Sequence, residues 1–215
     1  ILIDQVAIQH PYAALLVPTL ADAIGVYHTN PKVVFVPVDS RFGPYRDIVG
    51  GRLMLFEERP NRDMSHAESF GFSDDVIGAP DMFRAITADN DHRVDQRAYA
   101  KARLFDIYLS DWDRHVDQFR WATFEPEDRQ GKIYRPIPRD RDWAFNKIDG
   151  LFPTLMQSRF VVPKFQSFKP DYELVRGLVE NGLPWDRRIL AALTPQDWAE
   201  IADSMRIALT DQVLA

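Results

Sequence analysis

Two short acidic segments are the part of this sequence best suited to chemistry. Residues 111–118 read DWDRHVDQ, and residues 139–142 read RDRD. Carboxylates that face one space can orient an attacking hydroxyl, accept its proton and hold the metal ion that bridges the phosphates of a nucleotide. Acidic runs mixed with arginine are also typical of solvated surface with weak ion pairs, so neither segment alone identifies a site.

A helix and a hairpin are predicted to position the two segments. Residues 96–109 carry apolar side chains at helical spacing, and Asp95 is a suitable N-cap. Residues 119–123 (FRWAT) and 132–137 (KIYRPI) are rich in aromatic and branched side chains and flank a turn at 125–131, which indicates antiparallel strands. Because a hairpin returns the chain to the point where it left, we expect the two acidic segments to lie close together.

The residues of these segments resemble the active-site loops of atypical kinases. Asp113-Arg114-His115 followed by Gln118 resembles the Asp-Arg-His-x-x-Asn (or Glu) loop of the phosphatidylinositol kinases and the secreted Golgi casein kinases. Residues 140–145 (DRDWAF) resemble the Asp-x-x-x-x-Phe element that stands in those families where typical kinases have Asp-Phe-Gly. Over most of its length, the chain more closely resembles an uncharacterised group of bacterial proteins that carry DWDRH-x-DQ-x-RW and RP-x-PRDRD-x-AF.

This resemblance implies a catalytic base and a metal ligand. Asp113 would be the base that orients an acceptor hydroxyl toward the terminal phosphate of ATP. Asp140 lies five residues before Phe145, as in the resembled element, so it would be the principal ligand of Mg²⁺ or Mn²⁺. Asp142 is the rival for that role, because a small shift in register would exchange the two carboxylates.

Other residues of the first segment would support this chemistry. Gln118 takes the position of the asparagine that binds a second metal ion in kinases, but its amide oxygen is a weaker ligand than a carboxylate. Asp117 could supply the charge instead, so a second metal ion stays an open question. Arg114 and His115 are expected to support the loop, His115 through hydrogen bonds of a neutral imidazole. The arginines of the second segment could contact phosphate, but they fit better as counter-charges of the neighbouring carboxylates.

The N-terminal part resembles a piece of a kinase N-lobe. Its spacing predicts helices over residues 3–16, interrupted at Pro11, and over residues 18–24. Residues 33–38 and 52–56 are predicted strands and would be central strands of the N-lobe sheet.

Residues 57–61 would then be the hinge, whose backbone groups hold the adenine ring. Glu57 and Glu58 begin this hinge and are candidate nucleotide-binding residues, although an ordinary strand end explains them equally well. A kinase N-lobe normally also has a glycine-rich loop and a lysine on the next strand. The first lysine of this chain is Lys32, on the wrong strand, so we expect the sequence to begin downstream of those elements.

The remaining segments complete a mostly helical C-lobe. Residues 81–88 are predicted to form a short helix capped by Asp81. Residues 156–168 are apolar and could line an acceptor site or simply pack in the core. Residues 172–180 and 186–193 are predicted helices, and a capping box that begins at Thr194 predicts the last helix.

Composition limits the classes of partner. A net charge of -6 over 215 residues argues against nucleic acid or an anionic membrane surface as the main partner. The chain has no cysteine, which excludes a disulfide framework, a thiolate zinc site and a cysteine nucleophile. No apolar run is long enough to span a bilayer, so we expect a soluble domain, on either side of a membrane.

These observations predict an α+β, protein-kinase-like fold. Residues 1–62 would form a partial N-lobe with the hinge, and residues 63–215 a mostly helical C-lobe with the catalytic and metal-binding loops. The predicted function is an ATP-dependent phosphotransferase that uses magnesium or manganese. Its acceptor would be a hydroxyl of a protein, a lipid or a small molecule.

Two other functions are compatible with the same residues. A pseudokinase would bind a partner without turnover, and the missing lysine and Gln118 favour this alternative. A hydrolase would use the carboxylates as an acid/base pair, for example on a glycosidic bond. The hydrolase predicts an open cleft lined by exposed aromatic side chains, for which Trp112, Trp121 and Trp143 are candidates, although they fit a core better.

Overall fold

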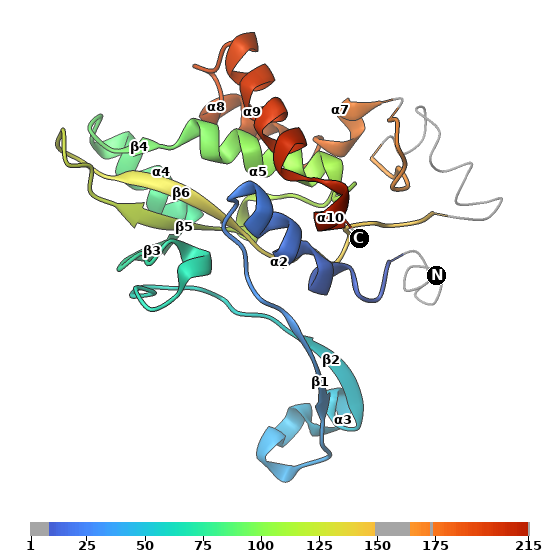
Figure 1. Cartoon of the computed structure of the whole chain (residues 1–215). Helices are drawn as coiled ribbons and strands as arrows, with labels where there is room; N and C mark the ends of the chain where they lie inside the picture. Colours follow the sequence, from blue (N-terminus) through green and yellow to red (C-terminus); the bar gives the residue numbers. More distant parts are fainter. Residues whose placement is uncertain (1–8, 149–163, 173, 215) are drawn as a thin grey trace.

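The described part of the chain has an α+β fold with two small sheets and several helices (Figure 1). The computed structural model describes residues 9–148, 164–172 and 174–214. In chain order the elements are α2 (Ala13–Ile24), β1 (Lys32–Val36), the 3-10 helix η1 (Ser40–Tyr45), α3 (Arg46–Val49), β2 (Arg52–Phe56), η2 (Glu68–Phe70), β3 (Val76–Gly78), α4 (Ala79–Ala88), β4 (Arg93–Val94), α5 (Gln96–Tyr108), η3 (Val116–Gln118), β5 (Phe119–Phe124), β6 (Ile133–Pro138), α7 (Val175–Leu178), α8 (Leu183–Ile189), α9 (Pro195–Ala208) and α10 (Asp211–Leu214).

The larger sheet contains the predicted hairpin. Its strand order is β3-β5-β6-β4, with β5 and β6 antiparallel and β4 parallel to β6. Phe119 is opposite Pro138 and Phe124 is opposite Ile133, so both strands are paired over their whole length. The hairpin prediction is therefore confirmed. The short edge strands β3 and β4 have too few residues to show an alternating pattern, and the sequence does not predict them.

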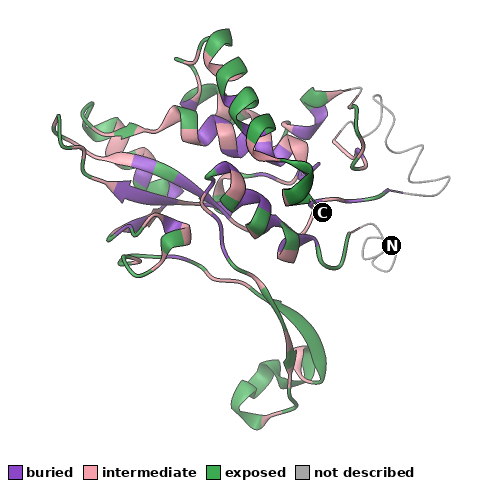
Figure 2. Ribbon diagram, in the orientation of Figure 1, coloured by how far each residue is buried: buried purple, intermediate pink, exposed green. Residues whose placement is uncertain are grey.

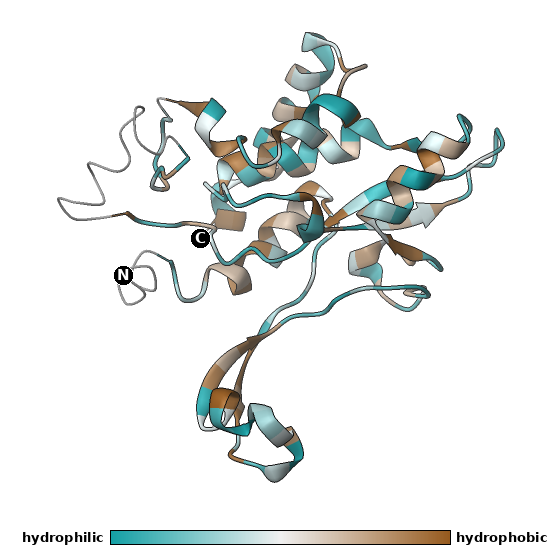
Figure 3. Ribbon diagram, turned by 180° about the vertical axis from the view of Figure 1, so that it is seen from behind, coloured by the Kyte–Doolittle hydropathy of each residue, from teal (hydrophilic) through white to brown (hydrophobic). Residues whose placement is uncertain are grey.

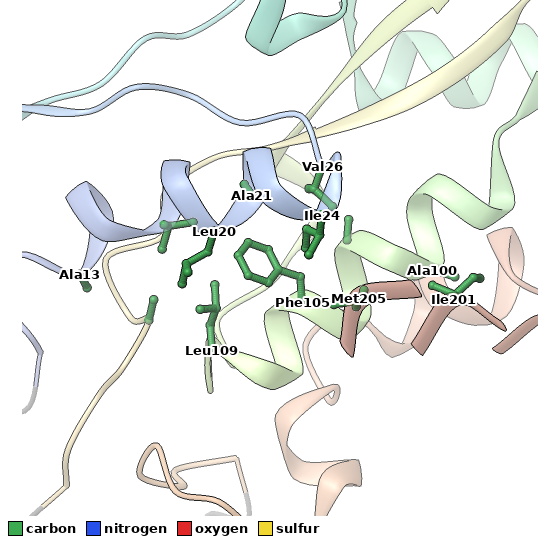
Figure 4. Close-up of a cluster of buried hydrophobic side chains, with 13 residues drawn as sticks. Ala13, Leu20, Ala21, Ile24, Val26, Ala100, Phe105, Leu109, Ile201 and Met205 are labelled. Atoms are coloured by element: carbon green, nitrogen blue, oxygen red, sulfur yellow. The ribbon is translucent and has the colours of Figure 1, made fainter. Parts of the chain in front are cut away.

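Helix α5 lies along this sheet and begins as predicted. The Asp95 carboxylate accepts a hydrogen bond from the backbone N–H of Ala98 at 3.0 Å, which satisfies one of the free donors of the first turn. Phe105 and Leu109 are fully buried in a cluster with side chains of α2 and α9. Figure 4 shows Phe105 and Leu109 facing α2, with Met205 of α9 next to Phe105.

Helix α2 differs from the prediction of two separate pieces. It begins at Ala13 and runs through Pro18 to Ile24 without a break. Proline removes one backbone hydrogen bond from a helix interior, but Val17 and Ile24 are buried in the core on this helix. Packing of this face outweighs the local cost of Pro18. Residues 3–8 of the predicted first helix lie outside the described residues.

Other predicted boundaries are corrected by the structure. Helix α4 begins at Ala79 with Gly78 as N-cap, so Asp81 lies in the first turn and does not cap the helix. Helix α7 covers only Val175–Leu178, and α8 begins at Leu183, earlier than predicted. The Thr194 capping box of α9 is confirmed, since the Thr194 hydroxyl accepts from the Asp197 N–H at 3.3 Å. Most of residues 156–168, the proposed acceptor lining, lie outside the described residues.

Residues 32–56 form an arm that projects from the body of the molecule (Figure 1). Strands β1 and β2 pair only with each other in the described part of the chain, so they are not central strands of a larger sheet there. Every residue of β2 is exposed (Figure 2). The strands are nevertheless hydrophobic (Figure 3), with Phe35 64% and Leu53 70% exposed. The apolar pattern predicts the strands, but the described residues leave most of their side chains exposed.

No helix among the described residues combines the length and the apolar character needed to cross a bilayer.

Candidate active site

The first acidic segment follows α5 through a sharp turn. Ser110 has a left-handed backbone with φ of 58°, and the N–H of Asp111 donates to the carbonyl of Asp106 at 2.9 Å. This turn ends the helix and directs residues 111–115 across the end of the hairpin. The Asn146 side chain then donates to the Ser110 carbonyl at 2.7 Å, which ties the turn to the chain that follows the second acidic segment.

The hairpin brings the two acidic segments together, as predicted. The N–H of Arg139 donates to the carbonyl of Gln118 at 2.9 Å. The Arg114 side chain is fully buried, and its Nη1 donates to the carbonyls of Arg139 at 2.6 Å and Asp140 at 3.1 Å. Arg114 therefore links the second segment to the first, and its support of a catalytic loop stays a prediction.

Asp113 and Asp140 are each held by a specific neighbour. Asp113 is half-buried, and its Oδ1 accepts a hydrogen bond from Asn181 Nδ2 at 2.9 Å. Asp140 has a left-handed backbone with φ of 57°, and its Oδ2 accepts from Gln118 Nε2 at 3.3 Å. Its N–H donates to Glu57 Oε1 at 2.9 Å. A non-glycine residue rarely adopts this conformation, and the bonds on both sides of Asp140 maintain it.

Asp142 lies close enough to the other two carboxylates to feel their charge. Burial raises its pKa, and the negative charges of Asp140 and Asp113 raise it further, to about 6. Its Oδ2 accepts a hydrogen bond from Gln9 Nε2 at 3.0 Å. The negative charges of Asp140 and Asp113 therefore both act on Asp142 and disfavour its ionised form.

Gln118 is oriented to support Asp140. Its Oε1 accepts from the N–H of His115 at 3.3 Å, so its Nε2 faces the Asp140 carboxylate. An amide has one acceptor end and one donor end, and here the acceptor end is engaged by the backbone. In this arrangement, Gln118 positions the predicted metal ligand, and its own oxygen faces away. His115 and Asp117 have exposed side chains, and His115 contributes through its backbone N–H.

A buried ion network lies beneath the two segments, and the sequence analysis missed it. The Asp106 carboxylate accepts hydrogen bonds from Arg103 Nη1 and Arg141 Nη1, each at 2.6 Å. Arg114 Nε lies 3.5 Å from the same carboxylate. Burial alone would raise the pKa of Asp106, but the three arginines lower it below its ordinary value. The only signal in the sequence was the spacing of Arg103 and Asp106, which places both on one helix face beside Phe105.

The arginines of the second acidic segment have different surroundings. Arg141 is 5% exposed and belongs to the buried network, while Arg139 lies near Glu57 at 3.9 Å. Arg141 is thus a counter-charge of Asp106 and Asp111, and not of the neighbouring carboxylates of its own segment as predicted. Asp111 lies 3.4 Å from Arg114 and 3.6 Å from Arg141, but its complete burial raises its pKa to about 7.

Glu57 and Glu58 lie where the arm joins the body, and their side chains make structural contacts. Glu57 Oε1 accepts from the Thr29 hydroxyl at 2.6 Å and also from the N–H of Asp140. Glu58 Oε2 accepts from the N–H of Asn30 at 2.7 Å. The two glutamates thus link the two legs of the arm, and Glu57 connects them to the second acidic segment. A nucleotide contact of these residues stays a prediction.

The donor set is suitable for a small divalent cation. Mg²⁺ prefers hard oxygen ligands and usually takes one or two protein carboxylates together with water and substrate phosphates. Asp140 and Asp142 supply two such carboxylates in one region. Among the described residues there is no group of three or more His, Cys, Asp or Glu side chains arranged around a common metal position.

The chain matches no protein-family model, and no curated protein or solved structure is significantly similar to it.

Proposed function

We propose that this protein is a phosphotransferase of the atypical kinase type, which moves the terminal phosphoryl group of ATP to a hydroxyl acceptor. One observation carries the proposal. The loop of Asp113 and the loop of Asp140 meet at the end of one hairpin, where buried Arg114 binds the backbone of the second loop. Phosphoryl transfer needs this combination of a carboxylate base and a separate carboxylate that holds the metal ion.

Each residue has a defined task in the proposed reaction. Asp113 accepts a hydrogen bond through Oδ1, and its Oδ2 would accept the proton of the acceptor hydroxyl. Asp140, with Asp142 nearby, would bind the Mg²⁺ or Mn²⁺ that neutralises the phosphates when ATP is present. Gln118 would keep the Asp140 carboxylate aimed at the metal position.

A pseudokinase is the second candidate function, and a specific contact favours it. The Gln118 amide nitrogen faces Asp140 in place of an oxygen ligand, which leaves no side-chain ligand from this position for a second metal ion. A hydrolase has less support, because Trp112 and Trp121 are buried and do not line an open cleft. Trp112 packs against Trp143 with ring centroids 4.7 Å apart.

Calorimetry with ATP, alone and with Mg²⁺ or Mn²⁺, tests the proposal first. We expect metal-dependent binding, followed by transfer of the terminal phosphate to a mixture of protein, lipid and small-molecule acceptors. The Asp113→Asn variant should bind ATP like the wild type but lose about 10²- to 10⁴-fold in transfer rate. Metal-dependent binding without transfer in the wild type would favour the pseudokinase. Absence of ATP binding by folded protein, with and without metal, would reject the phosphotransferase and leave the pseudokinase as a partner-binding module.

A further inference from the structure

The turn at Asn181 and Gly182 lies directly against the loop of Asp113. These residues connect α7 to α8 and are far from the loop in sequence, 68 residues in the case of Asn181 and Asp113. A Cβ added at Gly182 would lie 3.2 Å from the carbonyl oxygen of Arg114 and 2.6 Å from Arg103 Nη2. The absence of a side chain at Gly182 therefore allows the close approach that brings Asn181 to Asp113.

The Asn181 amide is oriented at both ends. Its Nδ2 donates to Asp113 Oδ1 at 2.9 Å, and its Oδ1 accepts from Lys164 Nζ at 3.3 Å. A lysine ammonium only donates hydrogen bonds, so it must face the oxygen of the amide. With the oxygen held by Lys164, the NH₂ group faces the carboxylate, and the flipped arrangement would place two donors against each other and two acceptors against each other.

Lys164 is itself held by aromatic packing. Its Nζ lies 5.0 Å from the ring centroid of Trp112, within the range of a cation–π interaction. Trp112 is 6% exposed and packs against Trp143 and Phe165, with ring centroids 4.7 and 4.9 Å away. Lys164 makes no ion pair with a carboxylate in the part of the chain that the structure describes. The Lys164 ammonium thus lies over Trp112 and donates to the Asn181 amide oxygen at the same time.

We propose that Asn181 is a positioning residue for Asp113 and that Lys164 sets the orientation of the Asn181 amide. The inference rests on the proposed function, because it assigns Asp113 the role of base. The hydrogen bond from Asn181 engages Asp113 Oδ1 and restricts rotation of the Asp113 carboxylate. Among the described residues, no donor contacts Asp113 Oδ2, so this oxygen is the one presented to an acceptor hydroxyl. Alignment of a base with its proton is a large part of its catalytic effect.

The kinetic test separates positioning from binding. Asn181→Ala should lower kcat about 10- to 100-fold, while the Kd for ATP with metal changes less than about twofold. Asn181→Asp should lower kcat at least as far, because it places a second negative charge against Asp113. Lys164→Met should lower kcat by a smaller factor than Asn181→Ala. Lys164→Arg keeps a cationic donor, so its kcat should be close to that of the wild type. In the double variant Asn181→Ala/Lys164→Met, the losses should not add, because both residues act through one bond.

A matched control and a spectroscopic measurement keep the test independent of folding and of activity. Asn90→Ala, at an exposed site, should leave both kinetic constants unchanged. In ¹H–¹⁵N spectra, the Asn181 side-chain amide, assigned by its absence in Asn181→Ala, should exchange slowly with solvent and shift in Asp113→Ala. Lys164→Met should broaden or shift the same resonance.

The outcomes distinguish this inference from the proposed function. An unshifted Asn181 amide in Asp113→Ala, or full kcat in Asn181→Ala, would overturn the positioning role even in an active kinase. If the wild type neither binds ATP nor transfers phosphate, the proposed function fails by itself. The amide shift in Asp113→Ala would then still decide whether Asn181 holds the Asp113 carboxylate.

Discussion

The buried Arg114 guanidinium donates through Nη1 to the backbone carbonyl of Arg139 at 2.6 Å. Arg114 directly follows Asp113, and Arg139 directly precedes Asp140. One side chain therefore joins the two loops that carry the carboxylates to which we assign base and metal ligand. Its charge is balanced by Asp106 and Asp111, at 3.5 and 3.4 Å. The position of the candidate site thus depends on the buried ion pairs of Arg114. The predictions that follow test both the site residues and these ion pairs.

Substitution of the two candidate metal ligands should separate their roles. Asp140→Asn keeps the shape of the side chain but removes its charge, so we expect at least about a tenfold weaker binding of ATP in the presence of Mg²⁺ and little change without metal. Asp142→Asn should have a smaller effect. Calorimetry with both variants measures the difference. A larger loss in Asp142→Asn would exchange the two assignments.

Removal of the Glu57 carboxylate should loosen the second acidic segment. In Glu57→Ala, the N–H of Asp140 and the Thr29 hydroxyl lose their acceptor, and we expect the free energy of unfolding to fall by about 1–3 kcal/mol. Metal-dependent ATP binding should also be weaker in Glu57→Ala than in the wild type. Glu58→Ala is the matched control, because Glu58 accepts from Asn30 at the same junction and makes no hydrogen bond to Asp140. Equal effects of the two variants on ATP binding would show that Glu57 acts only on the arm.

Asp106→Asn should be strongly destabilising. The variant leaves Arg103 and Arg141 buried without their shared counter-charge, and loss of one partner of a buried ion pair costs about 3–5 kcal/mol. Chemical denaturation at neutral pH measures this cost. Asp203→Asn is the matched control, since Asp203 also pairs with an arginine three residues away on a helix, but at the surface. The control should change stability by less than about 1 kcal/mol.

The stability difference between wild type and Asp106→Asn should depend on pH. The pKa of Asp106 is lowered in the folded state, so its stabilising effect is complete above the ordinary value of 3.8 and is lost as pH falls through the lowered folded pKa. The stability difference between wild type and Asp106→Asn should therefore shrink below about pH 4. Denaturation curves between pH 3 and 7 measure it, and a constant difference over this range would contradict the lowered pKa.

Gly182→Ala should disturb the contact between the Asn181 turn and the Asp113 loop. The backbone of Gly182 has φ of -87°, which alanine adopts without strain, so the effect is steric. The new methyl group would overlap Arg103 Nη2, which is held by Asp186. We expect a loss of about 1–3 kcal/mol in stability and a lower transfer rate. An unchanged melting temperature would mean that Arg103 moves without cost.

The elements with strong local signals could be predicted from the sequence. Asp95 caps α5, the Thr194 capping box begins α9, and β5 and β6 pair as a hairpin. These features depend on residues close together in the chain, so their energetics are visible in the sequence. The meeting of the two acidic segments follows from them, because a hairpin must return the chain to its starting point.

Other features depended on which distant surfaces meet, and only the tertiary structure decided them. Arg141 could have been a solvated surface arginine, but α5 presents Asp106 to it and both are buried. Pro18 could have ended α2, but burial of its apolar face in the core maintains the helix. Asn181 lies 68 residues from Asp113 in the chain and contacts it where Gly182 permits close packing. In each case the free energy comes from burial and from partners far away in sequence, which local spacing does not encode.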